Sequence, residues 1–110
     1  MVKGRIDEWV DEMFWGKVFG TKHDLILAIC DEELIDKRIK TKKVDIKISK
    51  QFYGEKIIED EETAVRMMKR CTIANLIGKR IVALAEKHGF ITKENIISIG
   101  GIPHAQFVKL

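Results

Sequence analysis

The sequence predicts one α+β domain: a small, antiparallel-rich sheet with a long or broken helix packed on one face. Short apolar runs bounded by turn-forming residues recur in both halves of the chain, as is typical of strands. Apolar residues at helical spacing fill residues 61–88 between them. The length of 110 residues fits one domain, and a hydrophobic content of 45% is enough for a core without metals or disulfides.

We divide the chain into an N-terminal helical extension, residues 1–13, and a single α+β domain, residues 14–110. Apolar residues between Val2 and Met13 recur at spacings of three and four, which predicts a short amphipathic helix. Such a helix could act as a docking arm.

Strands are predicted near both ends of the domain. Residues 13–19 and the unbroken apolar run 25–30 form a hairpin, and the second strand is expected to be central and buried on both faces. Acidic residues 31–33 then open a short helical turn. Residues 96–99 and 104–108 form the last two strands, separated by a bend.

The middle of the chain holds one further strand. Val44, Ile46 and Ile48 alternate with polar residues, which predicts a strand that buries these three side chains. Residues 52–54 are expected to end this strand, and residues 55–58 to add a short one.

The helical region is expected to begin at acidic residues 60–62 and to stop at Gly89, since acids favour helix starts and Gly favours helix ends. Around residues 73–77 a second side of this helix is apolar as well. Either the helix breaks near Thr72, or this part is buried by a partner. If the helix breaks, Asn75 could cap the second helix.

Bulk composition limits the classes of protein. Two cysteines without a CxxC motif or a Cys/His cluster predict reduced thiols and no metal site, and no cofactor is expected. The charged first residues and the lack of a long apolar run predict a cytoplasmic protein without membrane contact. Many Lys and Ile with few Asn and Gln suggest a thermophilic source.

Net charge is uneven, and one block is strongly basic. Between residues 37 and 50, seven cationic residues stand against Asp45 alone: Lys37, Arg38, Lys40, Lys42, Lys43, Lys47 and Lys50. Lysines can neutralise phosphates, and Tyr53 could stack on an unpaired base. The alternative is a solvated, lysine-rich edge with Phe52 and Tyr53 packed inward. In one unbroken helix, a second arc of cations could extend this patch: Arg66, Lys69, Arg70, Arg80 and Lys87.

Familiar catalytic motifs are absent, so the chain is interpreted as non-catalytic unless Cys30, Asp31 and His104 form a site. Cys30 could have a lowered pKa beside helix N–H groups and could join His104 and Asn75 in a Cys-His-Asn arrangement. The alternative is that Cys30 is a small core residue and Asp31 a helix cap.

Two further motifs carry polar groups. His104 and Gln106 would point the same way on a strand and could bind a small polar ligand, a base edge or a backbone, or could simply face solvent. Gly78 lies in an apolar segment, where it would permit close packing.

Four segments resemble an archaeal family known as domain of unknown function 424. They are residues 28–34, 52–54, 74–78 and 101–106, and their order and spacing match over roughly residues 14–110. The resemblance implies an archaeal, cytoplasmic source and brings no activity, substrate or cofactor. Asp36 stands where the family often has Gly, which makes a tight turn there uncertain.

The leading hypothesis is a non-catalytic module that binds RNA or a ribonucleoprotein, in a translation-related role. One alternative is an enzyme or small-ligand domain with a site around Cys30, Asp31 and His104. Another is a protein-interaction domain that self-associates through residues 73–77 or through its N-terminal arm.

Overall fold

The computed structural model describes residues 13–110, and the predicted N-terminal helix falls outside them. Within this range thirteen elements follow one another: β1 (Phe14–Gly20), β2 (Leu25–Asp31), η1 (Glu32–Leu34), β3 (Arg38–Lys40), β4 (Asp45–Lys47), α2 (Lys50–Tyr53), β5 (Lys56–Ile58), α3 (Glu61–Arg70), β6 (Ile73–Ile77), α4 (Lys79–Lys87), η2 (Lys93–Asn95), β7 (Ile96–Ile99) and β8 (Ile102–Val108). The fold is α+β, as the sequence predicts.

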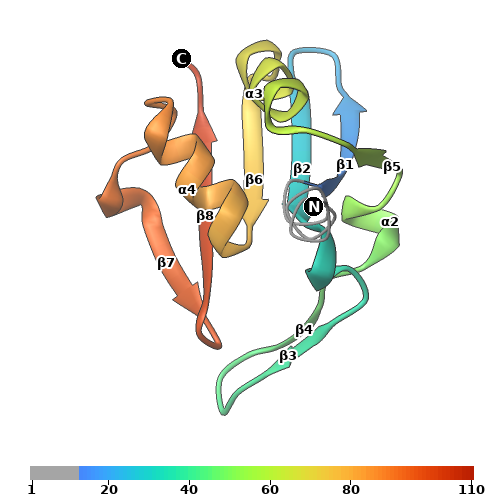
Figure 1. Cartoon of the computed structure of the whole chain (residues 1–110), viewed down its shortest axis with the longest axis vertical. Coiled ribbons are helices and arrows are strands. Elements are labelled where there is room, and N and C mark those ends of the chain that lie inside the picture. Colours follow the sequence, from blue (N-terminus) through green and yellow to red (C-terminus); the bar gives the residue numbers. More distant parts are fainter. Residues whose placement is uncertain (1–12) are drawn as a thin grey trace, which may run out of the picture.

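A six-stranded sheet in the order β5-β1-β2-β6-β8-β7 forms the centre of the domain. All neighbouring strands in it are antiparallel except β2 and β6, which are parallel and lie at its middle. Helices α3 and α4 cover one face of the sheet, and the β3–β4 hairpin projects from one end of the domain (Figure 1). The predicted hairpin of β1 and β2 is confirmed, with Phe14 opposite Asp31 and Gly20 opposite Leu25.

Two hydrophobic cores lie on opposite faces of the sheet. Leu27, Leu76 and Phe107 belong to the larger core, under α3 and α4. Ala28, Cys30 and Ile77, together with α2 and the base of the hairpin, form the smaller one. Neighbouring residues of a strand point to opposite faces, so β1, β2, β6, β7 and β8 each contribute to both cores.

The predicted long helix is interrupted by a strand. Asp60 caps α3 by accepting the Thr63 N–H at 2.7 Å, and the helix ends at Arg70. Ile73–Ile77 then form β6, hydrogen-bonded to β2 on one side and to β8 on the other. A central strand is buried on both faces and needs apolar side chains on both. The apolar residues of this segment therefore do not follow the one-sided pattern of an amphipathic helix.

This break corrects two expectations. Asn75 does not cap a helix, because it lies in β6 and the residue before α4 is Gly78. The expected arc of cations does not exist either, since Arg66 and Arg70 lie on α3 while Arg80 and Lys87 lie on α4. The apolar middle segment is buried within the sheet of this domain, without the help of a partner.

The predicted strand over residues 44–48 is correct, but its predicted burial is wrong. Ile48 is buried, whereas Ile46 is 39% exposed and Val44 is half-buried. The reason is that β4 pairs only with β3, a strand that the sequence did not reveal. The two make a separate ribbon outside the main sheet, and only its base, with Ile39 and Ile48, reaches the core.

Two short segments near the hairpin differ from the sequence-based expectation. Residues 50–53 form the helical turn α2 rather than the end of a strand, because the Ser49 side chain accepts the Phe52 N–H and starts a helix. Asp36 adopts a φ of 67°, so the turn is made there without glycine. Aspartate tolerates this left-handed conformation better than most residues.

A buried carboxylate joins the end of β2 to the start of α4. Asp31 is 1% exposed, and its two oxygens accept the backbone N–H groups of Arg80 and Ile81 at 2.9 Å each. Gly78 has a φ of 123°, and a Cβ on it would lie 2.4–2.7 Å from the carboxyl atoms of Asp31. Glycine therefore provides the close packing that the sequence predicts at this position.

We predict that Gly78→Ala lowers the free energy of unfolding by about 2 kcal/mol, because the new methyl group strains the backbone and displaces the Asp31 carboxylate. Urea unfolding followed by circular dichroism measures this change. Gly20→Ala is the control, since no atom lies within 4 Å of its Cβ position. Equal stability of the two variants would show that the cap tolerates a side chain.

Candidate functional site

A cluster of polar side chains lies on the sheet face away from α3 and α4. The Tyr53 hydroxyl donates a 2.7 Å hydrogen bond to Oδ1 of Asn75, and His104 Nε2 lies 3.1 Å from the same oxygen. Gln106 is the direct neighbour of Asn75 across the β6–β8 pair. Alternation along β8 places His104 and Gln106 on one face, as predicted. Residues from α2, β6 and β8 thus meet on one surface.

The contact with Asn75 and the burial of the ring together define the state of the imidazole. An amide oxygen can only accept, so His104 Nε2 carries the proton in its contact with Asn75. Burial lowers the pKa of His104 from its ordinary value, which favours the neutral ring. In that ring Nδ1 is an acceptor. The site therefore presents a neutral imidazole rather than a cation.

The alternative site around Cys30, Asp31 and His104 is not brought together. Cys30 and Asp31 follow one another in β2 and face opposite sides of the sheet, so Asp31 serves as the cap of α4. Cys30 and His104 share a row across the sheet, but Ile77 lies between them. Two strand spacings, about 10 Å, separate their backbones, which is beyond hydrogen-bond reach.

The thiol of Cys30 is in an environment that opposes ionisation. Its side chain is fully buried. Burial raises the pKa of the Cys30 thiol to about 12, and the neighbouring Asp31 charge adds to the effect. A reactive cysteine needs the opposite conditions, a lowered pKa and access to solvent.

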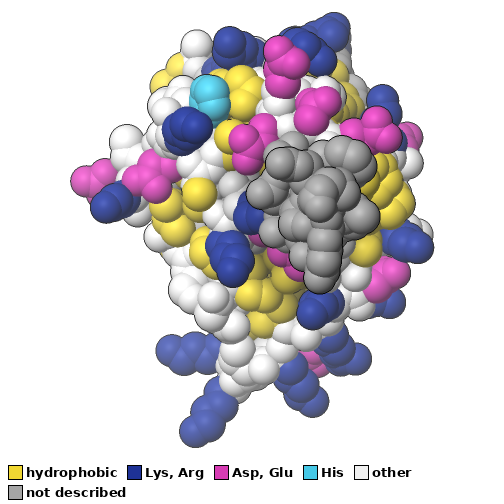
Figure 2. Space-filling view, viewed as in Figure 1, with side chains coloured by type: hydrophobic (Ala, Val, Ile, Leu, Met, Phe, Trp, Pro, Cys, Tyr) yellow, Lys and Arg dark blue, Asp and Glu magenta, His cyan; other side chains and the backbone are white. Residues whose placement is uncertain are grey.

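The basic block forms the projecting hairpin and the residues beside it. The side chains of Lys37, Arg38, Lys40, Lys42, Lys43 and Lys47 are exposed, and Lys and Arg gather on this projection in Figure 2. The guanidinium of Arg38 holds both oxygens of Asp45 at 2.7 Å, which neutralises the only carboxylate of residues 37–47. Lys50 lies outside the ribbon on α2, 3.8 Å from the Asp36 carboxylate.

The two aromatic residues beside the basic block have different surroundings. Tyr53 is only 8% exposed, and its ring packs in the smaller core. Phe52 is 40% exposed and contacts both Phe19 and Tyr53. The sequence pointed to Tyr53 as the stacking residue and missed Phe52. The helical turn that turns Phe52 outward is signalled only by the Ser49 cap.

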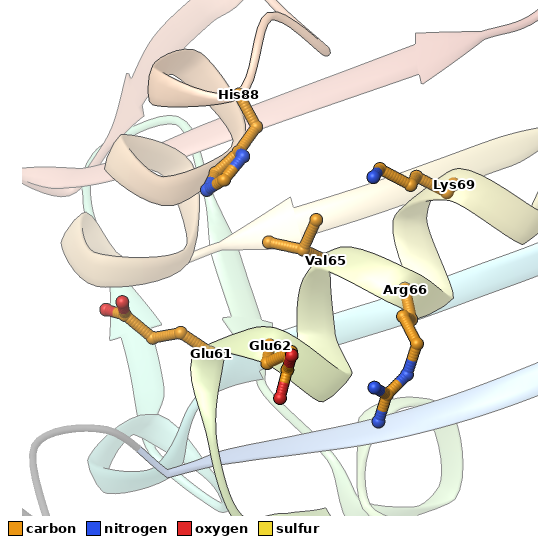
Figure 3. Close-up of a pocket in the computed structure, with 6 residues that line it drawn as sticks. All are labelled: Glu61, Glu62, Val65, Arg66, Lys69 and His88. Carbon is orange, nitrogen blue, oxygen red and sulfur yellow. The ribbon is translucent and has the colours of Figure 1, made fainter.

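Cavities lie elsewhere on the molecule. One groove of about 380 Å³ lies between α3 and the end of α4 and carries both signs of charge (Figure 3): Glu61, Glu62, Val65, Arg66, Lys69 and His88. Cys30, Asn75 and His104 line neither this groove nor three smaller cavities among the described residues.

Residues 13–110 show neither a metal-ligand cluster nor a membrane-spanning helix. No three Cys, His, Asp or Glu side chains in this range converge so that they could hold a metal ion. No helix in the same range combines the length and the apolar character that a membrane crossing requires.

The fold and the site together define a small α+β domain with an open, polar sheet face and a basic hairpin. The family described as "Protein of unknown function (DUF424)" matches residues 19–110, and the chain belongs to this family. Its structure is similar to the crystal structure of an uncharacterized conserved protein from the archaeon Methanopyrus kandleri, with a TM-score of 0.75 and 24% sequence identity. The similarity covers 89% of this chain and 94% of that one. No curated protein matches the chain.

Three of the segments that carry the family resemblance meet in the polar cluster. Tyr53 comes from the second segment, Asn75 from the third and His104 from the fourth, and their side chains are joined through Asn75 Oδ1. The first segment ends β2 and supplies Asp31, the cap of α4. The segments that carry the resemblance thus contribute to one polar surface and to the contact between the sheet and α4.

We predict that a thiol reagent at neutral pH labels Cys30 slowly in the folded protein, because the thiol is buried and its pKa is raised. Labelling is followed by mass spectrometry in a Cys71→Ala background, with the urea-unfolded protein as the fast reference. Labelling of the folded protein at the rate of the unfolded chain would return the thiol to consideration as a nucleophile.

We also predict a pH dependence of stability that originates from His104. Its folded pKa is lower than its unfolded value, so the unfolded state binds more protons and stability falls as the pH drops below about 6.5. Chemical unfolding between about pH 7.5 and 5.5 measures the trend. His104→Gln should flatten it, while His23→Gln, in an exposed turn, should not. The same pH dependence in wild type and His104→Gln would contradict the assignment.

Proposed function

We propose that this protein is a non-catalytic module that binds single-stranded RNA. The observation that carries the proposal is the projecting β3–β4 hairpin. Six exposed cations occupy residues 37–47, and the single carboxylate among them is already paired with Arg38. Such a concentration of positive charge on a ribbon that extends from the domain suits the phosphates of a nucleic acid.

The chemistry of the hairpin favours contacts with the backbone of the nucleic acid. The Arg38 fork is engaged by Asp45, which leaves five lysines to meet phosphates: Lys37, Lys40, Lys42, Lys43 and Lys47. A lysine ammonium is a compact point charge without fixed hydrogen-bond geometry. The hairpin is therefore expected to attract RNA with little preference for sequence.

The shape of the domain favours a single strand over a small metabolite. The polar cluster of Tyr53, Asn75 and His104 lies on an open sheet face next to the exposed ring of Phe52. Small ligands are usually held in concave pockets that bury most of their surface. Exposed sheet faces with aromatic rings are one of the surfaces that bind unpaired bases.

We predict that binding of a mixed-sequence single-stranded RNA of about 16 nucleotides weakens steeply with salt. Each neutralised phosphate contributes about −0.7 to the slope of log affinity against log salt, so four to six contacts give a slope of about −3 to −4. The double reversal Lys42→Glu with Lys43→Glu should lower the affinity and make the slope shallower. Both residues lie in the exposed turn of the hairpin, so the fold should be kept.

The matched control is Lys22→Glu with Lys93→Glu, which changes the net charge equally at exposed sites outside the hairpin. Fluorescence anisotropy across a salt series compares the three proteins. Wild type and the control should bind alike, and the hairpin reversal more weakly. Equal binding by both reversed proteins, or no binding by wild type at low salt, would end the case for this hairpin.

A further inference from the structure

We infer that the uncovered part of the sheet, on β6 and β8 next to Phe52, is a docking site for one unpaired nucleobase of the bound strand. The inference rests on the proposed RNA-binding function and assigns a second, chemically different role to a second surface. The hairpin would hold phosphates, and this surface would hold a base between a ring and a set of amide and imidazole groups.

The first step is that this part of the sheet is uncovered. Ala74, Leu76 and Phe107 point into the core under α3 and α4, so Asn75 and Gln106 face the other side. On that side α2 packs mainly over β1 and β2, and its Tyr53 side chain reaches Asn75 on β6. Gln106 is exposed, and so are its neighbours on the same face, Ile97 (56%) and Val108 (59%).

The second step concerns the hydrogen-bonding groups. Oδ1 of Asn75 is occupied by Tyr53 and His104, but its amide nitrogen makes no hydrogen bond within residues 13–110 and is not buried. The side chain of Gln106 likewise makes none there, and Nδ1 of His104 is an acceptor. Donors and acceptors set side by side are what a base edge requires.

The third step is that the Asn75 amide and its two partners are held in place before any ligand arrives. Asn75 is fixed by two hydrogen bonds and by its position on a central strand, and the Tyr53 ring is buried. The protein therefore loses little side-chain freedom when a ligand binds there, which favours affinity. Amides on solvated loops would lack this advantage.

The fourth step is the stacking surface. The Phe52 ring is supported by Phe19 at 5.4 Å and by Tyr53 at 4.8 Å between centroids, and 40% of the residue stays exposed. Phe52 contacts Tyr53, Tyr53 is hydrogen-bonded to Asn75, and Asn75 is paired with Gln106, so the ring and the amides lie on the same side of the sheet. A base that stacks on the ring can direct its edge toward the amides.

The last step links this surface to the hairpin. Ile39 and Ile48 at the base of the hairpin pack in the same core as Tyr53 and Ile77, on this side of the sheet. Gly100, in the β7–β8 turn, lies against Ile39. A single strand on the lysines can therefore continue onto the sheet face without crossing the helix-covered side.

The test compares two eight-nucleotide strands of the same length and charge, oligouridylate and an abasic ribose-phosphate strand, by fluorescence anisotropy at one low salt concentration. Wild type should bind the base-bearing strand about tenfold more tightly. Phe52→Ala and Gln106→Ala should each remove most of that difference and leave the abasic strand and the salt slope unchanged. Both side chains are exposed, and circular dichroism verifies the fold of each variant.

Val18→Ala and Ser98→Ala are the matched controls. Val18 is also 40% exposed but lies on the side of α3, and Ser98 alternates with Ile97 onto that same side. Neither should change binding to either strand. If Phe52→Ala and Gln106→Ala bind both strands as wild type does, the docking site is refuted while hairpin binding stands. If wild type binds neither strand, both proposals fail.

Discussion

The structure depends on the buried carboxylate of Asp31. It sits at the end of the central strand β2 and receives the first N–H groups of α4, so it replaces the partners that a helix start lacks. Burial raises the pKa of Asp31 despite these hydrogen bonds and the nearby Arg80, which shows that desolvation is the largest influence on this carboxyl. Without this carboxylate, buried N–H groups would lack an acceptor, and each such group would lower the stability by about 1–3 kcal/mol. Gly78 is the sequence feature that makes the approach feasible.

This contact fixes α4 over one face of the sheet and leaves the other face with a different composition. Under the helices the hydrophobic core residues that the strands contribute are Leu, Ile, Ala and Phe, with Asp31 at the start of α4. On the opposite face, α2 and the hairpin base cover only part of the surface, and the strands there carry Asn75, His104 and Gln106. Polar side chains in the middle of a sheet have a cost unless they are hydrogen-bonded, and the shared Asn75 oxygen reduces it. Such a half-open, partly satisfied face can bind a ligand without rebuilding the core.

The sequence predicts the parts of this fold that local rules decide. Alternation and turn residues gave the β1–β2 hairpin and the last strand, and charge at its start gave α3. The strand Ile73–Ile77 was not predicted, because five apolar-rich residues between two helices fit a buried helix or a buried strand equally well. The exposure of Ile46 was missed because alternation does not say whether a strand joins the main sheet. The sequence could name the residues of the polar cluster. The β2–β6 pairing is needed to show that Cys30 lies outside the cluster, and the contact of Phe52 with Tyr53 is needed to show that Phe52 lies beside it.

The separation of charge from hydrogen bonding on this surface argues for a polymer rather than a small anion. A phosphate-bearing metabolite would need cations and polar groups within one pocket. Here the lysines lie on a ribbon that extends away from the domain (Figures 1 and 2), while the neutral His104 and the two amides lie on the sheet. A polymer satisfies both surfaces at once, since its phosphates repeat along the chain and its bases can turn toward the sheet. A short linkage between two weak surfaces raises the overall affinity well above that of either one. In the proposed RNA-binding function the hairpin would set how strongly and how quickly RNA binds, and the sheet face would set whether an unpaired base is recognised.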